Sequence, residues 1–169
     1  MFQIGDLVFY SGSGVCRIDS VTSREFGDEK KDYYLLIPVH SPESAVYLPV
    51  DNEKLLSRMR SPLSCDEVKG LIRSIPDRSP QWIADEGRRK TEFTRILREG
   101  NQSEILDLIR LIYQQQQKLR AAGRKLHQCD ERAFREAQRV LCDEFSLALS
   151  IEPGEVEGYI GDMLHHMTA

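Results

Sequence analysis

The sequence predicts a two-domain α+β protein, with a small antiparallel β-barrel at residues 1–60 and an all-α bundle of about five helices at residues 61–169. Two observations indicate this division. Up to about residue 50, apolar positions alternate with polar ones or form short runs between turns, which is the pattern of strands. From Ser64 onward the apolar period lengthens to about 3.6 residues, the period of an amphipathic helix. The composition changes at residues 58–63, where we place the domain boundary.

Four or five short strands are predicted in the first domain, among them residues 6–10, 15–22, 33–39 and 45–50. Tight turns join them, and residues 51–56 are expected to form a short turn of helix that closes the barrel. Short strands with hairpin links favour a highly bent antiparallel barrel. Such a barrel leaves an edge that a partner's strand can join. Pro38 and Pro49 support the alternative, an edge protected from pairing by proline and charge.

Five amphipathic helices are expected in the second domain. Their expected starts are Ser64 with Glu67, Ser79 with Pro80, Asn101 with Glu104, the residues after Gly123, and Pro153. The first and third starts have the form of a capping box, in which two side chains bond the free N–H groups of the first turn. Pro76 ends the first helix, and Gly100 is expected to end the second in a left-handed conformation.

The stretch at residues 79–90 contains the only tryptophan, Trp82, and the densest basic triplet, Arg88-Arg89-Lys90. If Pro80 occupies the first helical position, Trp82 lies within about 20° of Phe93 around the helix axis. Charged residues occupy the positions between these two aromatic residues on the same face. Two interpretations follow: either Trp82 caps a hydrophobic core, or it projects toward a partner.

The net charge of −4 is unevenly distributed along the chain. Residues 1–60 carry 7 basic and 9 acidic side chains, residues 61–140 carry 16 and 12, and residues 141–169 carry none and 6. Only the middle segment is net basic, and its surplus is too small for tight autonomous binding to nucleic acid. It is sufficient for a protein that another contact already holds close to nucleic acid.

The sequence contains no recognisable catalytic or cofactor-binding motif. Residues 12–14 form a glycine-containing turn without the features of a phosphate-binding loop, and the four cysteines lack the spacing of metal ligands. We therefore expect no enzymatic activity, no cofactor and no metal site. No apolar run reaches the length of a membrane span and no signal-peptide pattern is present, so we expect a soluble cytoplasmic protein with no membrane contact.

The first domain resembles the RNA-polymerase-interacting domain of the CarD/CdnL family, which the transcription-repair coupling factor shares. The resemblance is carried by Ile4-Gly5-Asp6-Leu7-Val8-Phe9-Tyr10, Gly14-Val15-Cys16-Arg17-Ile18, Tyr33-Tyr34-Leu35-Leu36 and Leu48-Pro49-Val50-Asp51-Asn52. The helical half, with a tryptophan ahead of a basic pair, resembles the C-terminal domain of the same family. The chain has none of the coupling factor's helicase modules, so the short CarD-like regulator is the better match.

The resemblance implies an SH3/Tudor-like barrel that binds a lobe of the bacterial RNA polymerase β subunit by strand pairing. The helical domain is then expected to contact promoter DNA, with weak sequence specificity, at the upstream edge of the transcription bubble. There the family's tryptophan wedges into the minor groove and stabilises the open complex. An apolar wedge of this kind offsets the cost of unstacking a base step. The alternative is a protein–protein interaction or scaffold module with no direct DNA contact.

The resemblance also assigns site residues. The polymerase-binding residues are expected to be Arg24, Val46, Tyr47 and Leu48, with Tyr47 in place of a second basic residue of the family. The DNA-binding residues are expected to be Trp82, Arg88, Arg89 and Lys90. Here four more residues separate the tryptophan from the basic pair than in the family, about one helical turn or 6 Å. We expect a monomer, although the exposed barrel edge also permits a strand-exchanged dimer.

Overall fold

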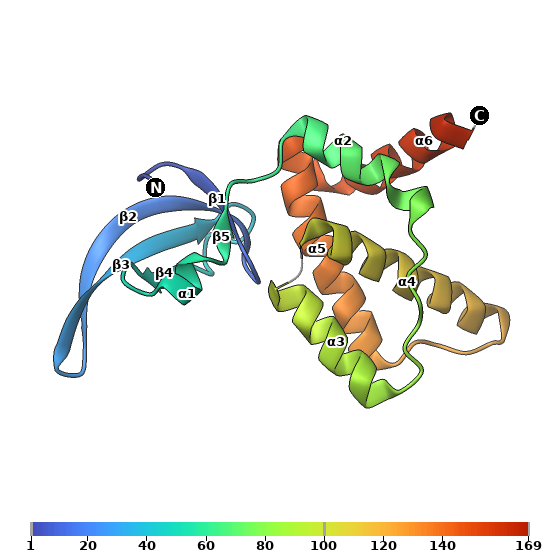
Figure 1. Ribbon diagram of the computed structural model, residues 1–169, viewed down its shortest axis with the longest axis horizontal. Helices are drawn as coiled ribbons and strands as arrows, with labels where there is room; N and C mark the ends of the chain where they lie inside the picture. The colour runs from blue at the N-terminus through green and yellow to red at the C-terminus, as the bar shows by residue number, and fades with distance from the viewer. Residues whose placement is uncertain (1, 100, 169) are drawn as a thin grey trace. The chain divides into compact units, whose positions relative to one another are not determined.

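The computed structural model describes residues 2–99 and 101–168 (Figure 1). The chain divides into two compact units, Met1–Pro62 and Leu63–Ala169. As predicted, the first is an antiparallel β unit and the second is helical.

The first unit is a five-stranded antiparallel sheet with the strand order β4-β3-β2-β1-β5. Its strands are β1 (Leu7–Tyr10), β2 (Gly14–Phe26), β3 (Glu29–Pro38), β4 (Val46–Pro49) and β5 (Met59–Arg60). Figure 1 shows that β2 and β3 form a long curved hairpin. This hairpin extends beyond the predicted strands because its outer part is polar and exposed and so lacks an apolar pattern.

A β-bulge in β2 decides which side chains face the core. Ile18 pairs with Leu36, but Ser20 pairs with Leu35, so one extra residue is inserted between them. An inserted residue moves every following side chain to the other face of the sheet. The even-numbered residues of β2 therefore point inward up to Ile18 and outward from Ser20, and Arg24 lies on the outer face.

The inner face of the sheet forms a small hydrophobic core. Its buried members are Val8, Cys16, Ile18, Leu36, Leu48 and Met59. The sequence assigned Met59 to the domain boundary, whereas the structure places it in β5, paired with Tyr10 of β1. A two-residue strand has no periodicity, so only its tertiary partners identify it. The short helix α1 (Glu53–Leu56) also packs against this core through Leu55 and Leu56.

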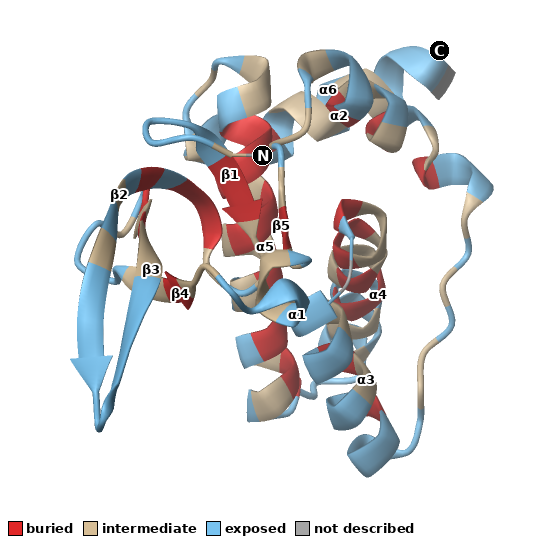
Figure 2. Ribbon diagram, turned by 60° about the vertical axis from the view of Figure 1, so that its left-hand side comes forward, coloured by how far each residue is buried: buried red, intermediate tan, exposed pale blue. Residues whose placement is uncertain are grey.

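Among its described residues, the second unit has five α-helices and two short 3-10 helices, in agreement with the predicted bundle. They are α2 (Cys65–Arg73), η1 (Ile75–Asp77), α3 (Glu86–Glu99), α4 (Gln102–Ala121), α5 (Gln128–Leu149), η2 (Pro153–Glu155) and α6 (Val156–Thr168). Figure 2 shows buried residues along much of α5, which packs against α2, α3, α4 and α6. The buried face of α5 includes Ala137, Leu141 and Phe145, as its apolar stripe predicts.

The predicted helix ends are mostly confirmed. Ser64 and Glu67 form a capping box at α2, and Asn101 and Glu104 form another at α4, with all four hydrogen bonds between 2.7 and 3.3 Å. Gly123 follows α4 with φ of +69°, a conformation that favours glycine. The C-cap predicted at Gly100 lies outside the described residues.

The start of α3 differs from the prediction. Ser79 and Pro80 do not begin the helix, which starts at Glu86 after an irregular stretch. The reason is local: the Asp85 carboxylate accepts a hydrogen bond from the Arg88 N–H (2.8 Å), which is the contact of an N-cap residue. Trp82 therefore precedes α3, and the residues between it and Arg88 do not form the predicted extra helical turn.

Candidate functional site

The outer edge of the sheet is formed by β4, which pairs with β3 on one side only. Val50 N–H donates to Asp32 C=O (3.1 Å), and Tyr34 pairs with Leu48. Because backbone groups alternate in direction along a strand, the groups of Leu48 face β3 and those of Tyr47 and Pro49 face outward. Tyr47 thus presents an N–H and a C=O at the edge, whereas Pro49 presents only a C=O, which also accepts a hydrogen bond from the Asn52 N–H (3.4 Å). This edge is short, and proline limits it to one outward donor at these two positions.

Arg24 and Tyr47 form a contact on the outer face of the sheet. The Arg24 guanidinium lies 3.9 Å from the centroid of the Tyr47 ring and donates a hydrogen bond to its hydroxyl group. Both residues are held by β3, which pairs Lys31 with Arg24 and Leu35 with Tyr47. The ring therefore gives the guanidinium a surface on which it stacks. This contact fixes the direction of a cation that remains exposed to solvent.

The other two predicted polymerase-binding residues of β4, Val46 and Leu48, point toward the inner face of the sheet. Leu48 is only 1% exposed and belongs to the hydrophobic core, and the half-buried Val46 packs against the same core. Their side chains are therefore not available at the outer face, and only their strand contributes to the edge.

The outer face also carries two aromatic residues, Phe26 and Tyr33, that were not among the predicted site residues. Phe26 is 60% exposed and packs edge-on against Tyr33, with ring centroids 5.5 Å apart. The pairing of β2 with β3 and of β3 with β4 places Phe26, Tyr33 and Tyr47 on one face of the sheet with Arg24. The sequence signal for this face is the alternation along β3, but the bulge in β2 hides which residues of β2 join it.

In the helical unit, the irregular stretch that carries Trp82 is held at both ends. At its start, the Arg78 guanidinium donates to Asp107 (2.8 Å) and to the hydroxyl group of Ser103 (2.6 Å), both in α4. At its end, the Arg89 guanidinium donates to the carbonyl groups of Ile83 (3.1 Å) and Ala84 (3.4 Å). Residues 79–85 are therefore a fixed connection between α2 and α3.

Arg89 is the central residue of this arrangement. It is 3% exposed and makes a two-point ion pair with Asp130 of α5, through Nε (2.9 Å) and Nη2 (3.0 Å). The hydrogen bonds to Asp130 raise the pKa of Arg89, so the guanidinium stays charged. Arg89 was a predicted DNA-binding residue, but its buried position does not fit that role. Four residues before Phe93 on α3, it lies on the inward face of the helix.

Trp82 is half-buried against these residues. Its ring packs edge-on against Phe93, with centroids 6.0 Å apart at 69°, and the Arg89 guanidinium lies 4.7 Å from the ring centroid. Phe93 itself is buried. The ring thus has one side fixed by a packed aromatic residue and a buried cation, and it retains exposed surface.

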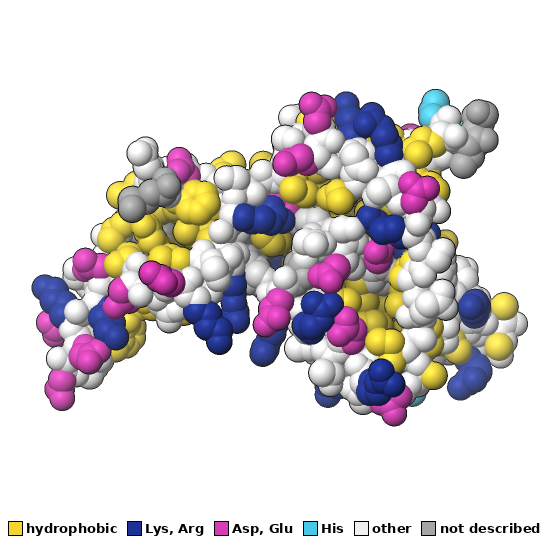
Figure 3. Space-filling view, viewed as in Figure 1, with side chains coloured by type: hydrophobic (Ala, Val, Ile, Leu, Met, Phe, Trp, Pro, Cys, Tyr) yellow, Lys and Arg dark blue, Asp and Glu magenta, His cyan; other side chains and the backbone are white. Residues whose placement is uncertain are grey.

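Arg88 and Lys90 are exposed, on opposite flanks of the inward-facing Arg89. Successive helical residues lie 100° apart, so the basic triplet forms no single patch. Figure 3 shows basic and acidic side chains mixed over the visible face of the helical unit. This mixture agrees with the small charge surplus of residues 61–140.

The described residues contain no group of three or more His, Cys, Asp or Glu side chains that could hold a metal ion. Among the same residues, no helix is both long and apolar enough to cross a membrane.

The first unit is similar to a known domain family. Residues 2–60, about a third of the chain, match the CarD-like/TRCF RID domain, the RNA polymerase-interacting domain shared by CarD and TRCF. The match covers β1 to β5 and includes both Arg24 and Tyr47.

Proposed function

We propose, from the CarD-like/TRCF RID domain at residues 2–60, that this chain is a bacterial CarD-like transcription regulator that binds the RNA polymerase β-subunit lobe and stabilises the promoter open complex. The domain makes the chain an RNA polymerase-interacting, transcription-related protein, and the domain is an interaction module rather than a catalytic one. The single observation that carries the proposal is that this domain contains an exposed cation, Arg24, whose direction is fixed by its contact with Tyr47.

The polymerase contact uses two neighbouring features of the first unit. The outward backbone groups of Tyr47 and Pro49 offer hydrogen bonds to a strand of the β-subunit lobe. Arg24, stacked on Tyr47, lies beside this edge on the outer face and pairs with an acidic side chain of the lobe. Because Tyr47 already orients the guanidinium, less side-chain entropy is lost when the complex forms.

The DNA contact uses Trp82 together with Arg88 and Lys90. The exposed part of the Trp82 ring wedges at the upstream edge of the bubble, where a distorted base step is already weakly stacked. Arg88 and Lys90 contact the phosphate groups, while Arg89 supports the tryptophan from inside the helical unit. Three of the four predicted DNA-binding residues, Trp82, Arg88 and Lys90, therefore belong to the proposed DNA contact.

The proposal requires that polymerase binding come first. The helical unit has too small a positive surplus to hold DNA by itself. Once the first unit is bound to the polymerase, the linked helical unit reaches the promoter at a raised effective concentration, and a few weak contacts suffice.

The test is binding of the full chain to purified RNA polymerase at several salt concentrations. Arg24→Glu is expected to weaken binding about tenfold or more, because it places a carboxylate where a cation meets an acidic partner. Lys54→Glu, a charge reversal at an exposed residue of α1, is the matched control and is expected to bind like wild type. Equal binding of wild type and Arg24→Glu would contradict the proposed contact.

The alternative function is a scaffold module that binds proteins but never DNA. It is distinguished by crosslinking the full chain to promoter DNA within the polymerase complex. We expect crosslinks from residues near Trp82, and their absence while polymerase binding persists would favour the scaffold.

A further inference from the structure

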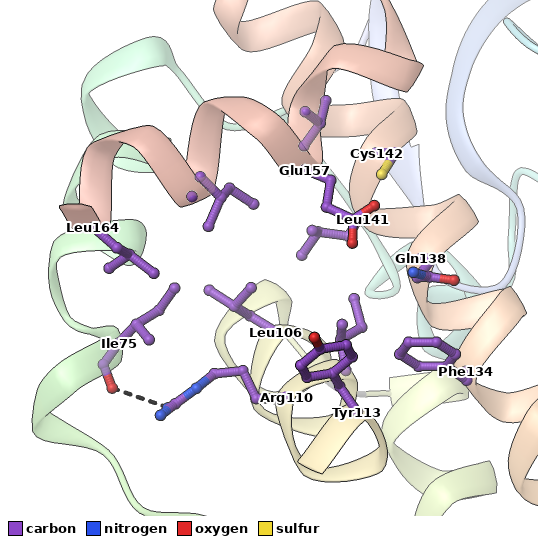
Figure 4. Close-up of a pocket in the computed structure, with 14 residues that line it drawn as sticks. Ile75, Leu106, Arg110, Tyr113, Phe134, Gln138, Leu141, Cys142, Glu157 and Leu164 are labelled. Carbon is purple, nitrogen blue, oxygen red and sulfur yellow. Dashed lines mark hydrogen bonds between the residues drawn. The ribbon is translucent and has the colours of Figure 1, made fainter. Parts of the chain in front are cut away.

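The helical unit contains a cavity of about 290 Å³ that the proposed function does not use. Figure 4 shows its walls, which come from η1, α4, α5 and α6. Most of the lining is apolar and includes Ile75, Leu106, Phe134, Leu141, Ile160 and Leu164. For scale, a dry apolar cavity of about 150 Å³ accepts benzene, so this cavity has room for a molecule of about two rings.

Its polar lining does not suit an anion. Arg110 is the one basic residue among those that line it, and its guanidinium already donates to the carbonyl groups of Ile75 (2.9 Å) and Arg78 (3.1 Å). Asp107 lies 3.8 Å from the same nitrogen and, because it also pairs with Arg78 at 2.8 Å, offsets only part of the Arg110 charge. Burial raises the pKa of the Cys142 thiol to about 11, with Asp143 and Glu157 adding to the shift, so the thiol is neutral.

Glu157 is the one acidic residue among those that line the cavity. It lies on the exposed side of α6, and no basic side chain of the described residues lies within ion-pair distance of it. The Tyr113 hydroxyl and the Gln138 amide lie on the same lining and can accept hydrogen bonds as well. A cation with an apolar body therefore fits both the walls and the charge.

The helix α6 keeps this space open. Residues 157, 160, 161 and 164 line the cavity and follow the spacing of one helical face. At Gly161, in the middle of this face, a Cβ atom would meet nothing within 4 Å. A larger side chain at this position therefore has room to enter the cavity.

We propose that this cavity binds a hydrophobic amine, with its apolar body between α4, α5 and α6 and its ammonium group at Glu157. The cavity is too small for an amphipathic helix, which needs a groove long enough for several side chains. The inference is independent of polymerase and DNA binding, because none of the lining residues belongs to the proposed polymerase or DNA contacts.

The test measures binding of 1-naphthylmethylamine to the full chain by calorimetry and by protein NMR. The neutral analogue 1-naphthylmethanol and the anionic 1-naphthoic acid are measured beside it. Gly161→Leu fills the cavity, Glu157→Gln removes its charge, and Gly158→Leu changes the same helix outside the cavity lining. Circular dichroism checks that each variant is folded.

We expect the amine to bind wild type and Gly158→Leu equally and to lose measurable binding to Gly161→Leu. Glu157→Gln is expected to weaken amine binding about two- to fivefold, to the level of the alcohol, as for a solvent-exposed ion pair. The acid is expected to bind more weakly than the alcohol. Binding that Gly161→Leu leaves unchanged, a preference for the acid, or no binding of the amine at millimolar concentration would each overturn the proposal.

Discussion

Replacing Asp130 by alanine is expected to remove the charge that compensates Arg89 inside the helical unit. The two side chains are 1% and 4% exposed, and two hydrogen bonds of 2.9 and 3.0 Å join them. Without Asp130, the guanidinium would remain buried with only the Ile83 and Ala84 carbonyl groups as partners. Breaking a buried ion pair in this way costs about 3–5 kcal/mol of unfolding free energy.

Two variants separate the buried charge from other effects. Arg89→Met/Asp130→Leu leaves no uncompensated charge, so it is expected to recover much of the stability that Asp130→Ala loses. Arg95→Ala is the control on the same helix, since Arg95 pairs with Glu92 at the surface (2.7 Å). Arg95 also pairs with Glu104 at the surface (3.2 Å), and because solvent screens such pairs we expect a much smaller loss than for Asp130→Ala.

Urea denaturation followed by circular dichroism measures these stabilities, and the fluorescence of the single tryptophan reports on the environment of Trp82. Because Arg89 lies against the Trp82 ring, Asp130→Ala is also expected to increase quenching of this fluorescence by acrylamide. A loss below about 1 kcal/mol with unchanged quenching would refute the reasoning. Arg89 would then be free to leave the interior, and its predicted contact with DNA would again be reasonable.

Three further outcomes are expected. Tyr47→Ala should weaken polymerase binding about two- to fivefold, which is the contribution of an exposed cation–π contact. Tyr47→Phe keeps the ring and should weaken binding less. A titration with polymerase measures both variants. Glu144→Ala should lower the unfolding free energy by about 2–4 kcal/mol in urea, because the buried Gln102 amide and the Leu63 N–H lose their acceptor. Burial raises the pKa of the Cys142 thiol from 9.0 to about 11, so the folded chain keeps a neutral thiol where the unfolded chain ionises. This contribution to stability is fully present below pH 9.0 and is lost as the pH rises toward about 11. The stability of wild type relative to Cys142→Ala should therefore fall by about 1 kcal/mol between pH 8 and 11, after allowance for partial exposure.

Features set by local sequence were predictable. The capping boxes at Ser64 and Asn101 use side chains three residues apart, and the glycine after α4 adopts the positive φ expected for it. The helix stripes and the early strands follow from their periods, because each buries one face. The resemblance of the first unit to a polymerase-interacting domain also rested on contiguous motifs, and the family match agrees with it.

Features set by distant partners were not predictable. The basic triplet looks like one patch in the sequence, and nothing local indicates that Asp130, 41 positions away, takes Arg89 into the interior. Likewise, Ser79 and Pro80 form a good helix start, but Asp85 forms the one that the chain uses. The contact of Arg24 with Tyr47 depends on a β-bulge, which a single sequence does not reveal.

The lifetime of promoter open complexes after challenge with a competitor tests the central claim most directly. Wild type is expected to prolong this lifetime, and Arg24→Glu is expected to lose the effect together with polymerase binding. Trp82→Ala, checked for folding by its melting curve, is expected to bind polymerase normally and yet lose most of the prolongation, because the wedge is absent. If folded, polymerase-bound Trp82→Ala prolongs the lifetime as well as wild type does, the tryptophan is only a packing residue and the proposed mechanism is wrong.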